Sequence, residues 1–245
     1  MADRDGLALL WDIDGTLLTT GRAGVFALEE AARDTLGAGV DMDDLATAGL
    51  TDVEIAMAII RSAGRSPETV LVNRFLRAYE NHLPAALPRK QGRVLPGVQE
   101  ILEGLADRTD VLSLLLTGNT RAGAWAKLDH YGLRRFFTDG AFADDTRDRP
   151  AIARRALDMV RQSRADISPD RVYVIGDTPH DILCGRAIGA RTIAVASGVY
   201  SEEELRAHDP WWALPVLPAS RDFFGRVVRG NTKIKRRPSK RIPSR

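Results

Sequence analysis

The chain has 245 residues, 44% of them hydrophobic and 28% charged, which is typical of a globular protein with a substantial core. A single cysteine, Cys184, excludes a disulfide within the chain, and no apolar run approaches the roughly 18 residues of a membrane-spanning helix. Acidic residues precede the first apolar run, which excludes a typical secretory signal at the amino terminus. We therefore expect a cytoplasmic protein with no membrane span.

The formal net charge of +2 is unevenly distributed along the chain. Residues 230–245 contain seven Lys and Arg and no acid, so residues 1–229 hold 28 Lys and Arg against 33 Asp and Glu, a charge of about −5. The basic segment lacks apolar periodicity and is expected to be disordered. It is interpreted either as a solubilising tail or as a segment that makes weak electrostatic contacts with nucleic acid or an anionic surface.

The first expected element is a strand over residues 7–11, LALLW, which is apolar throughout, as a strand buried on both faces must be. It ends at Asp12 and Asp14, two carboxylates one residue apart, followed by Gly15. Side chains two residues apart on an extended strand end point to the same side. Two like charges so placed need a nearby cation or protonation to relieve their repulsion.

The segment that follows the first strand contains no convincing strand and shows helical patterns instead. Helices are expected over residues 23–36, 52–62 and 67–81. We predict that residues 19–94 form an inserted helical domain on a core made of residues 1–18 and 95–229, with residues 230–245 as a separate tail.

Beyond residue 95, apolar runs and helical patterns alternate. Strands are expected at 111–116, 172–175 and 192–196, with a weaker candidate at 136–142. Helices are expected at 96–108, 150–162 and 180–190. The last of these helices is expected to end with Gly189 at its C-cap. Strands that alternate with helices predict the α/β class, with a doubly wound, Rossmann-like parallel sheet.

Polar side chains follow three of the expected strands, and parallel sheets of this kind bind ligands at the carboxyl ends of their strands. The polar residues are Asp12, Asp14, Thr117, Asn119, Asp177 and Asp181, and Gly118 lies between Thr117 and Asn119. An oxygen-rich set without sulfur suits a hard cation, and Mg²⁺ is the usual one where phosphate is handled. The spacing does not fit an EF-hand, and no His and Cys pair has the spacing of zinc ligands.

Four segments resemble the motifs of the haloacid dehalogenase-like (HAD) superfamily, in the same order. They are DIDGT (12–16), LLLTGN (114–119), the pair Arg149-Pro150 at a helix start, and GDTPHD (176–181). The helical insertion after the first motif resembles the C1-type cap of that superfamily. The resemblance is strongest to phosphoglycolate phosphatase-like members. It implies a Mg²⁺-dependent phosphatase that acts on a small phosphorylated metabolite through an aspartyl-phosphate intermediate. Whether the protein is a monomer or a homodimer stays open.

The resemblance implies a role for each residue of the first two motifs. Asp12 would be the nucleophile that attacks phosphorus. Asp14 would give a proton to the leaving oxygen and later take one from water. Thr117, with the backbone N–H groups of Gly118 and Asn119, would bind the phosphoryl oxygens.

The other two motifs would supply the metal site and a fixed cation. The Mg²⁺ ligands would be Asp12, Asp14 through its carbonyl, Asp177 and Asp181. Arg149 stands where the family usually has Lys, and it would bind the phosphoryl group and assist catalysis with the same charge but a different geometry. Arg147 is a nearby competitor for this role.

Several of these residues also have plain structural interpretations. Thr117 could serve only as the N-cap of the helix that follows it, and Asp181 could cap its own helix. In the inserted helical segment, Arg22, Thr51 and Asp52 are the polar candidates for substrate selection.

Two other functions stay open at this point. A phosphomutase of the β-phosphoglucomutase type would keep the same aspartate pair. A regulatory or nucleic-acid-associated protein could have the same fold without catalysis, although the intact set of Asp12, Asp14 and Asp177 argues against it.

Overall fold

The structure is a computed structural model that describes residues 6–37, 39–40, 42, 47–144 and 146–229. The predicted disordered tail at residues 230–245 lies outside the described residues and stays a prediction.

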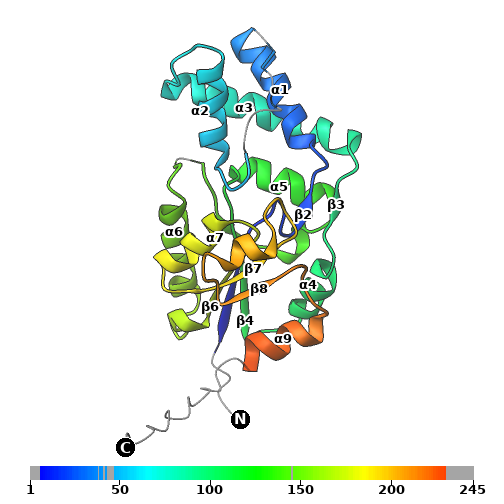
Figure 1. The fold of residues 1–245 in the computed structure, drawn as a ribbon, viewed down its shortest axis with the longest axis vertical. Helices are drawn as coiled ribbons and strands as arrows, with labels where there is room; N and C mark the ends of the chain where they lie inside the picture. Colours follow the sequence, from blue (N-terminus) through cyan, green and yellow to red (C-terminus); the bar gives the residue numbers. More distant parts are fainter. Residues whose placement is uncertain (1–5, 38, 41, 43–46, 145, 230–245) are drawn as a thin grey trace, which may run out of the picture.

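A six-stranded parallel sheet forms the centre of the molecule (Figure 1), with the strand order β5-β4-β1-β6-β7-β8. The strands are β1 Leu7–Trp11, β4 Val111–Leu116, β5 Gly140–Ala141, β6 Val172–Gly176, β7 Arg191–Val195 and β8 Trp212–Leu214. The chain adds β4 and β5 on one side of β1 and β6 to β8 on the other. This confirms the predicted doubly wound α/β fold. It also places the point where the winding reverses, the usual ligand site of such sheets, at the carboxyl end of β1.

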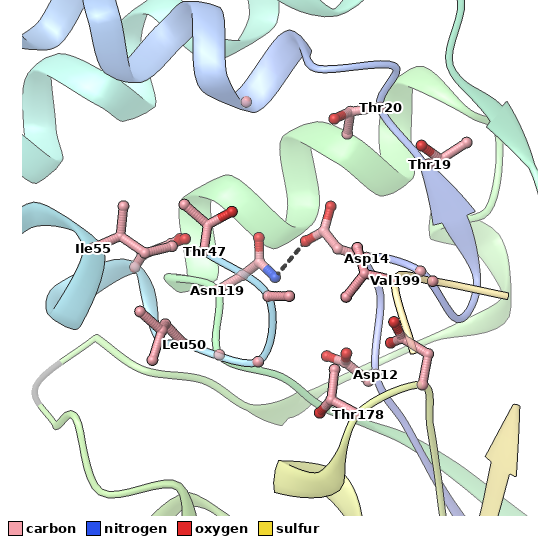
Figure 2. Close-up of a pocket in the computed structure, with 18 of the residues that line it drawn as sticks. Asp12, Asp14, Thr19, Thr20, Thr47, Leu50, Ile55, Asn119, Thr178 and Val199 are labelled. Atoms are coloured by element: carbon pink, nitrogen blue, oxygen red, sulfur yellow. Dashed lines mark hydrogen bonds between the residues drawn. The ribbon is translucent and has the colours of Figure 1, made fainter. Parts of the chain in front are cut away.

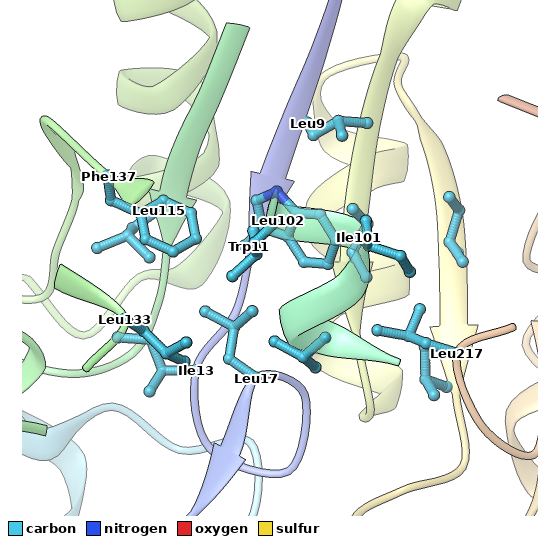
Figure 3. Packing of buried hydrophobic residues seen from close by; sticks show 14 of the residues in the cluster. Leu9, Trp11, Ile13, Leu17, Ile101, Leu102, Leu115, Leu133, Phe137 and Leu217 are labelled. Carbon is cyan, nitrogen blue, oxygen red and sulfur yellow. The ribbon is translucent and has the colours of Figure 1, made fainter. Parts of the chain in front are cut away.

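Strand β1 is buried on both faces of the sheet, which explains why its sequence is apolar throughout. Leu9 and Trp11 lie in one core, and Ala8 and Leu10 lie in another. The first core is covered by α4 (Val98–Ala106), α5 (Arg121–His130) and α9 (Ser220–Arg229), and the second by α6 (Arg149–Ser163) and α7 (Pro179–Ala187). Figure 3 shows Trp11 against Leu102 of α4 in the first core. Full burial of a large apolar side chain contributes about 1.5–3 kcal/mol, so this packing stabilises β1 in the centre of the sheet.

A layer of three helices lies beyond the carboxyl ends of the strands (Figure 1). It consists of α1 (Ala23–Leu36), α2 (Asp52–Ser62) and α3 (Thr69–Ala86), which share a hydrophobic core of their own. The first two helices have the predicted bounds, whereas α3 begins later and ends later than predicted. The chain enters and leaves this layer through β2 (Leu18–Thr19) and β3 (Arg93–Val94), which pair antiparallel. The domain boundaries at residues 18/19 and 94/95 stay a prediction.

Some local predictions are wrong. Helix α7 ends at Ala187 with Ile188 as its C-cap, and Gly189 follows in the left-handed conformation with φ 67°. Thr117 does not cap the helix after β4, because Thr120 holds that position and accepts a hydrogen bond from the Gly123 N–H. The candidate strand at 136–142 is reduced to the two residues of β5. Several further elements have no counterpart among the predicted ranges: β2, β3, β8, α5, α8 (Glu202–Arg206) and α9.

Among the described residues, none of the helices combines the length and the apolar character that a bilayer crossing requires.

Candidate active site

Three buried carboxylates meet where β1 and β6 end. Asp12 directly follows β1, and its N–H continues the sheet ladder by donating to the Ile175 carbonyl at 2.9 Å. Asp177 follows β6, and Asp181 lies in the first turn of α7. Asp12, Asp177 and Asp181 each place one carboxylate oxygen within 4.8 Å of the other two. The structure therefore brings together the three carboxylates that the sequence placed at two separate strand ends.

The pKa values of two of these carboxylates are strongly perturbed. Burial, and then the charge of Asp181, raises the pKa of Asp12 to about 7, and Arg149 acts in the opposite direction. Burial, followed by the charges of Asp181 and Asp12, raises the pKa of Asp177 to about 9. A bound cation would replace the protons that the cluster otherwise retains. Because all the donors are oxygen atoms, the residues fit a hard divalent cation such as Mg²⁺.

Two loops approach Asp177 so closely that a side chain on either glycine would displace its carboxylate. A Cβ atom on Gly198 would lie 1.8 Å from Asp177 Oδ2, and one on Gly15 would lie 2.3 Å from the same oxygen. Gly15 also has φ 78°, a conformation that residues with a side chain rarely adopt. Thr16 Oγ1 donates to Asp177 Oδ1 at 3.1 Å. The Gly-Thr pair after the two aspartates therefore shapes the edge of the carboxylate cluster.

Arg149 is a buried cation beside the carboxylate cluster. Its guanidinium forms an ion pair with Asp181 and lies against Gly118, where a Cβ atom would be 2.7 Å from Nη1. Arg147, by contrast, is exposed, and its contact within the described residues is with Met57 Sδ. The geometry therefore favours Arg149 over Arg147 as the cation beside the carboxylates.

Asp181 differs from the other two carboxylates because both of its oxygens have partners. Oδ1 pairs with Arg149, and Oδ2 accepts hydrogen bonds from the Thr178 N–H at 3.0 Å and from Thr178 Oγ1 at 2.7 Å. The bond from the Thr178 N–H belongs to a capping box at the start of α7, in which the Thr178 side chain in turn accepts from the Asp181 backbone N–H. Asp181 thus has the structural role that its position suggested, and its role as a metal ligand stays a prediction.

The segment after β4 forms a compact loop beside Asp12. Thr117 Oγ1 accepts hydrogen bonds from Asn119 Nδ2 at 2.8 Å and from the Asn119 N–H at 3.3 Å. The N–H of Gly118 has no hydrogen-bond partner in the described part of the chain, and Gly118 lines the cavity described below. An unpaired backbone donor at this position is suited to bind an anionic oxygen.

Asp14 is held by two donors. Lys127 Nζ lies 2.6 Å from Asp14 Oδ2, and Asn119 Nδ2 donates to the same oxygen at 2.9 Å. Lys127 comes from α5 and is 5% exposed. Burial alone lowers the pKa of a lysine, but here Asp14, Tyr79 and Asp52 outweigh that effect and raise the pKa of Lys127, so the ammonium stays charged.

These side chains line a cavity of about 470 Å³ between the sheet edge and the helical layer. Figure 2 shows Asp12, Asp14 and Asn119 along one side of this cavity. The helical layer supplies both polar and apolar walls, with Thr19, Thr20, Arg22, Val25, Leu28, Asp52, Ile55 and Tyr79 among the lining residues. Of the three predicted selection residues, Arg22 and Asp52 line the cavity. Thr51 instead caps α2 through a capping box with Glu54.

Asp52 joins the helical layer to the sheet. Its backbone N–H donates to the Gly118 carbonyl at 2.8 Å, and its carboxylate accepts from the Thr120 N–H at 2.8 Å. Burial raises the pKa of Asp52 to about 6, although the charge of Lys127 and the Thr120 hydrogen bond act to lower it. The first turn of α2 is thereby fixed to the loop that follows β4.

Replacing Asp52 by Asn is expected to reduce the pH dependence of stability. The pKa of about 6 in the folded chain lies above the ordinary 3.8, so the contribution of this group is fully present below about pH 4 and is lost as the pH rises through 6. Asn stays neutral and still accepts a hydrogen bond. The free energy of unfolding of the variant relative to the parent should therefore rise by up to about 3 kcal/mol between about pH 4 and 7.

Denaturant titrations at several pH values measure this difference. Asp129→Asn, which changes an exposed carboxylate on α5, is the matched control. If the stability of the parent and of Asp52→Asn changed with pH in parallel, the raised pKa of Asp52 would be contradicted.

Two residues of this site, Lys127 and Tyr79, were not among the sequence-based candidates. Both lie inside helices, seven or more residues from any motif, so their orientation depends on tertiary packing. One signal was available for Lys127: residues 1–229 contain only two lysines, Lys90 and Lys127.

A doubly wound sheet with a cavity at its switch point, lined by clustered carboxylates and buried cations, defines an α/β enzyme. The sequence model of the haloacid dehalogenase-like hydrolases matches residues 9–195. The chain therefore belongs to the haloacid dehalogenase-like hydrolase family.

Named relatives agree with this membership. "Probable phosphatase IndB" of Dickeya dadantii is 29% identical over 82% of this chain and 86% of its own length. A 5'-nucleotidase of Pseudomonas aeruginosa is also 29% identical, over 82% of this chain and 88% of its own.

Solved structures share the fold. A predicted phosphoglycolate phosphatase from Haemophilus somnus has a TM-score of 0.67 at 16% identity, covering 92% of this chain and 99% of its own. CbbY from Rhodobacter sphaeroides, in complex with phosphate, has a TM-score of 0.65 at 20% identity and covers 80% and 90%.

Proposed function

We propose that this protein is a Mg²⁺-dependent phosphatase that hydrolyses a small phosphomonoester through a phosphorylated Asp12. The coarser part of this statement follows from the family and its named relatives: the chain is a phosphoric monoester hydrolase of the HAD type. The observation that carries the finer part is the cluster of Asp12, Asp177 and Asp181 beside Asp14 and Arg149, at one end of the cavity.

In this proposal, the first step transfers the phosphoryl group to the enzyme. A carboxylate oxygen of Asp12 bonds to phosphorus as the bond from phosphorus to the leaving oxygen breaks, and Asp14 gives that oxygen a proton. Thr117 and the Gly118 N–H bind the non-bridging oxygens, and Arg149 offsets their charge. A Mg²⁺ ion held by Asp12, Asp177 and the Asp14 carbonyl would neutralise charge between the nucleophile and the phosphate.

The second step regenerates Asp12. Asp14, now ionised, takes a proton from a water molecule, whose oxygen attacks phosphorus and releases inorganic phosphate. The walls supplied by the helical layer limit the access of other water while the phosphoryl group is transferred. These walls also select the leaving group, because they line the same cavity as Asp12 and Asp14.

A cavity of about 470 Å³ is in the range of small-molecule sites and suits a small phosphorylated metabolite. The 5'-nucleotidase relative makes nucleoside monophosphates one class to include in a substrate search. A cytoplasmic location stays a prediction.

Purified protein with Mg²⁺ is expected to release phosphate from a generic aryl phosphate, and excess EDTA should abolish the release. The same assay on a panel of sugar phosphates, nucleoside monophosphates and phosphorylated carboxylic acids identifies the substrate class by kcat/KM. No phosphate release from any compound, with Mg²⁺ present, would contradict the proposed function. Retention of the phosphoryl group on an isomerised sugar, with a bisphosphate activator, would identify a phosphomutase instead.

A further inference from the structure

Lys127 lies at the centre of a buried hydrogen-bond network that ends on Asp14. Its ammonium is 2.6 Å from Asp14 Oδ2 and 2.5 Å from Asn119 Oδ1. The Asn119 amide turns its nitrogen to the same Asp14 oxygen, as Figure 2 shows, and also to Thr117 Oγ1. Lys127 and Asn119 thus connect Asp14, at the end of β1, with the loop after β4 and with helix α5.

The two ends of this ion pair have very different environments. The Lys127 side chain is 6% exposed, whereas that of Asp14 is 42% exposed at the cavity. Holding an ammonium away from water is costly unless it is paired and hydrogen-bonded. Lys90 is the only other lysine before position 230, where the sequence otherwise uses arginine for a permanent positive charge. A lysine at this buried place therefore points to a specific requirement for a compact charge.

The two carboxylate oxygens of Asp14 differ in their hydrogen-bond partners. Oδ2 receives hydrogen bonds from Lys127 and Asn119, whereas Oδ1 has no hydrogen-bond partner within the described residues. A proton cannot occupy an oxygen that already faces two donors. A proton carried by Asp14 must therefore sit on Oδ1, the oxygen left free for the reacting group.

We propose that Lys127 is a positioning residue, which fixes the Asp14 carboxylate so that Oδ1 faces the leaving oxygen of the substrate. This inference rests on the proposed function, because it takes Asp14 as the group that protonates that oxygen. Lys127 touches neither phosphorus nor the leaving group in this assignment. It acts through the orientation of Asp14.

Leaving groups of different basicity provide a test that a purely structural role would not affect. An alkyl phosphate has a poor leaving group that needs a proton, whereas an aryl phosphate with an acidic phenol leaves almost without one. The constant kcat/KM reports only events up to departure of the leaving group. The ratio of kcat/KM for the alkyl phosphate to kcat/KM for the aryl phosphate therefore isolates the first step. Lys127→Met is expected to lower kcat/KM for the alkyl phosphate by about 10²- to 10³-fold, and for the aryl phosphate by about tenfold or less.

The matched control is Lys90→Met. Lys90 is the other lysine before residue 230, lies over the Phe26 ring, and does not line the cavity. It should leave the alkyl-to-aryl ratio unchanged. Lys127→Arg provides a second variant, which keeps the charge if Lys127→Met fails to fold. Its larger planar guanidinium cannot occupy the same point between two oxygens, so the same selective loss is expected.

Asp14→Asn, assayed in parallel, tests the proton-donor role of Asp14 separately from the positioning role of Lys127. If Asp14→Asn lowers kcat/KM equally for both substrates, Asp14 is not the proton donor, and the Lys127 proposal is wrong as well. If Asp14→Asn is selective but the folded Lys127 variants keep the alkyl-to-aryl ratio of the parent, the positioning role of Lys127 is overturned and the proposed function stands. Selective loss in both supports the proposal.

Discussion

Asp12→Asn is expected to reduce turnover of any phosphomonoester substrate by at least about 10⁴-fold, the scale seen when a covalent nucleophile is removed. The amide that replaces the carboxylate has almost the same shape but cannot attack phosphorus. We expect Asp12→Asn to stay folded, so unfolding would not explain its loss of turnover. Asp12 is a buried carboxylate whose pKa is raised by burial and by Asp181, so a neutral residue at this position should be tolerated or stabilising.

The measurement combines steady-state turnover with trapping of the covalent intermediate. Acid quenching during turnover, followed by mass spectrometry, should show a phosphoryl group on the parent enzyme and none on Asp12→Asn. Asp158→Asn, which changes an exposed carboxylate on α6, is the control for the loss of one acid. Unchanged turnover in Asp12→Asn would rule out the nucleophile assignment, and trapping on a different residue would redirect it.

Removing divalent cations is expected to destabilise the protein, and more so as the pH rises. Without a cation, the pKa values of Asp12 and Asp177 are raised to about 7 and about 9, above the ordinary 3.8. The stabilising contribution of such groups is present at low pH and is lost as the pH rises through the folded pKa values. The melting temperature of the metal-free protein should therefore fall by on the order of 5–10 °C between about pH 6 and pH 9.

Adding Mg²⁺ should remove most of this fall, because the cation takes over the role of the protons in the cluster. Thermal melts in EDTA and in Mg²⁺ across this pH range provide the test. In Asp177→Asn, the difference between the two conditions should shrink. Identical melting temperatures in EDTA and Mg²⁺ at about pH 9 would exclude a cation at this cluster.

Much of the carboxylate edge could be predicted because its residues follow strands directly. A buried strand such as β1 shows itself through continuous apolar sequence, and the parallel arrangement then carries the residue after it to a known edge. Asp12, Thr117 and Asp177 follow β1, β4 and β6, which are neighbours in the sheet, so order along the chain sufficed to bring them together.

The partners of these residues depend on packing that a local pattern does not encode. Lys127 reaches Asp14 only because α5 lies across the sheet edge with that face inward. Asp52 meets Thr120 only because α2 is seated on the loop after β4. The contact between Asp181 and Arg149 depends likewise on the relative placement of α6 and α7. Motif spacing therefore indicates the reacting groups, and tertiary structure supplies the groups that hold them.

The antiparallel pairing of Leu18 with Val94 and of Thr19 with Arg93 has a consequence for how this chain can be rebuilt. Cα atoms that face each other in such a ladder are about 4.5–5.5 Å apart, a gap that a two-residue turn can close. We therefore expect that α1, α2 and α3, which lie between these two strands, can be replaced together by another segment. We expect a hairpin in their place to leave the carboxylates open to solvent, and we expect a different set of helices, grafted at the same two points, to change which substrates enter the cavity.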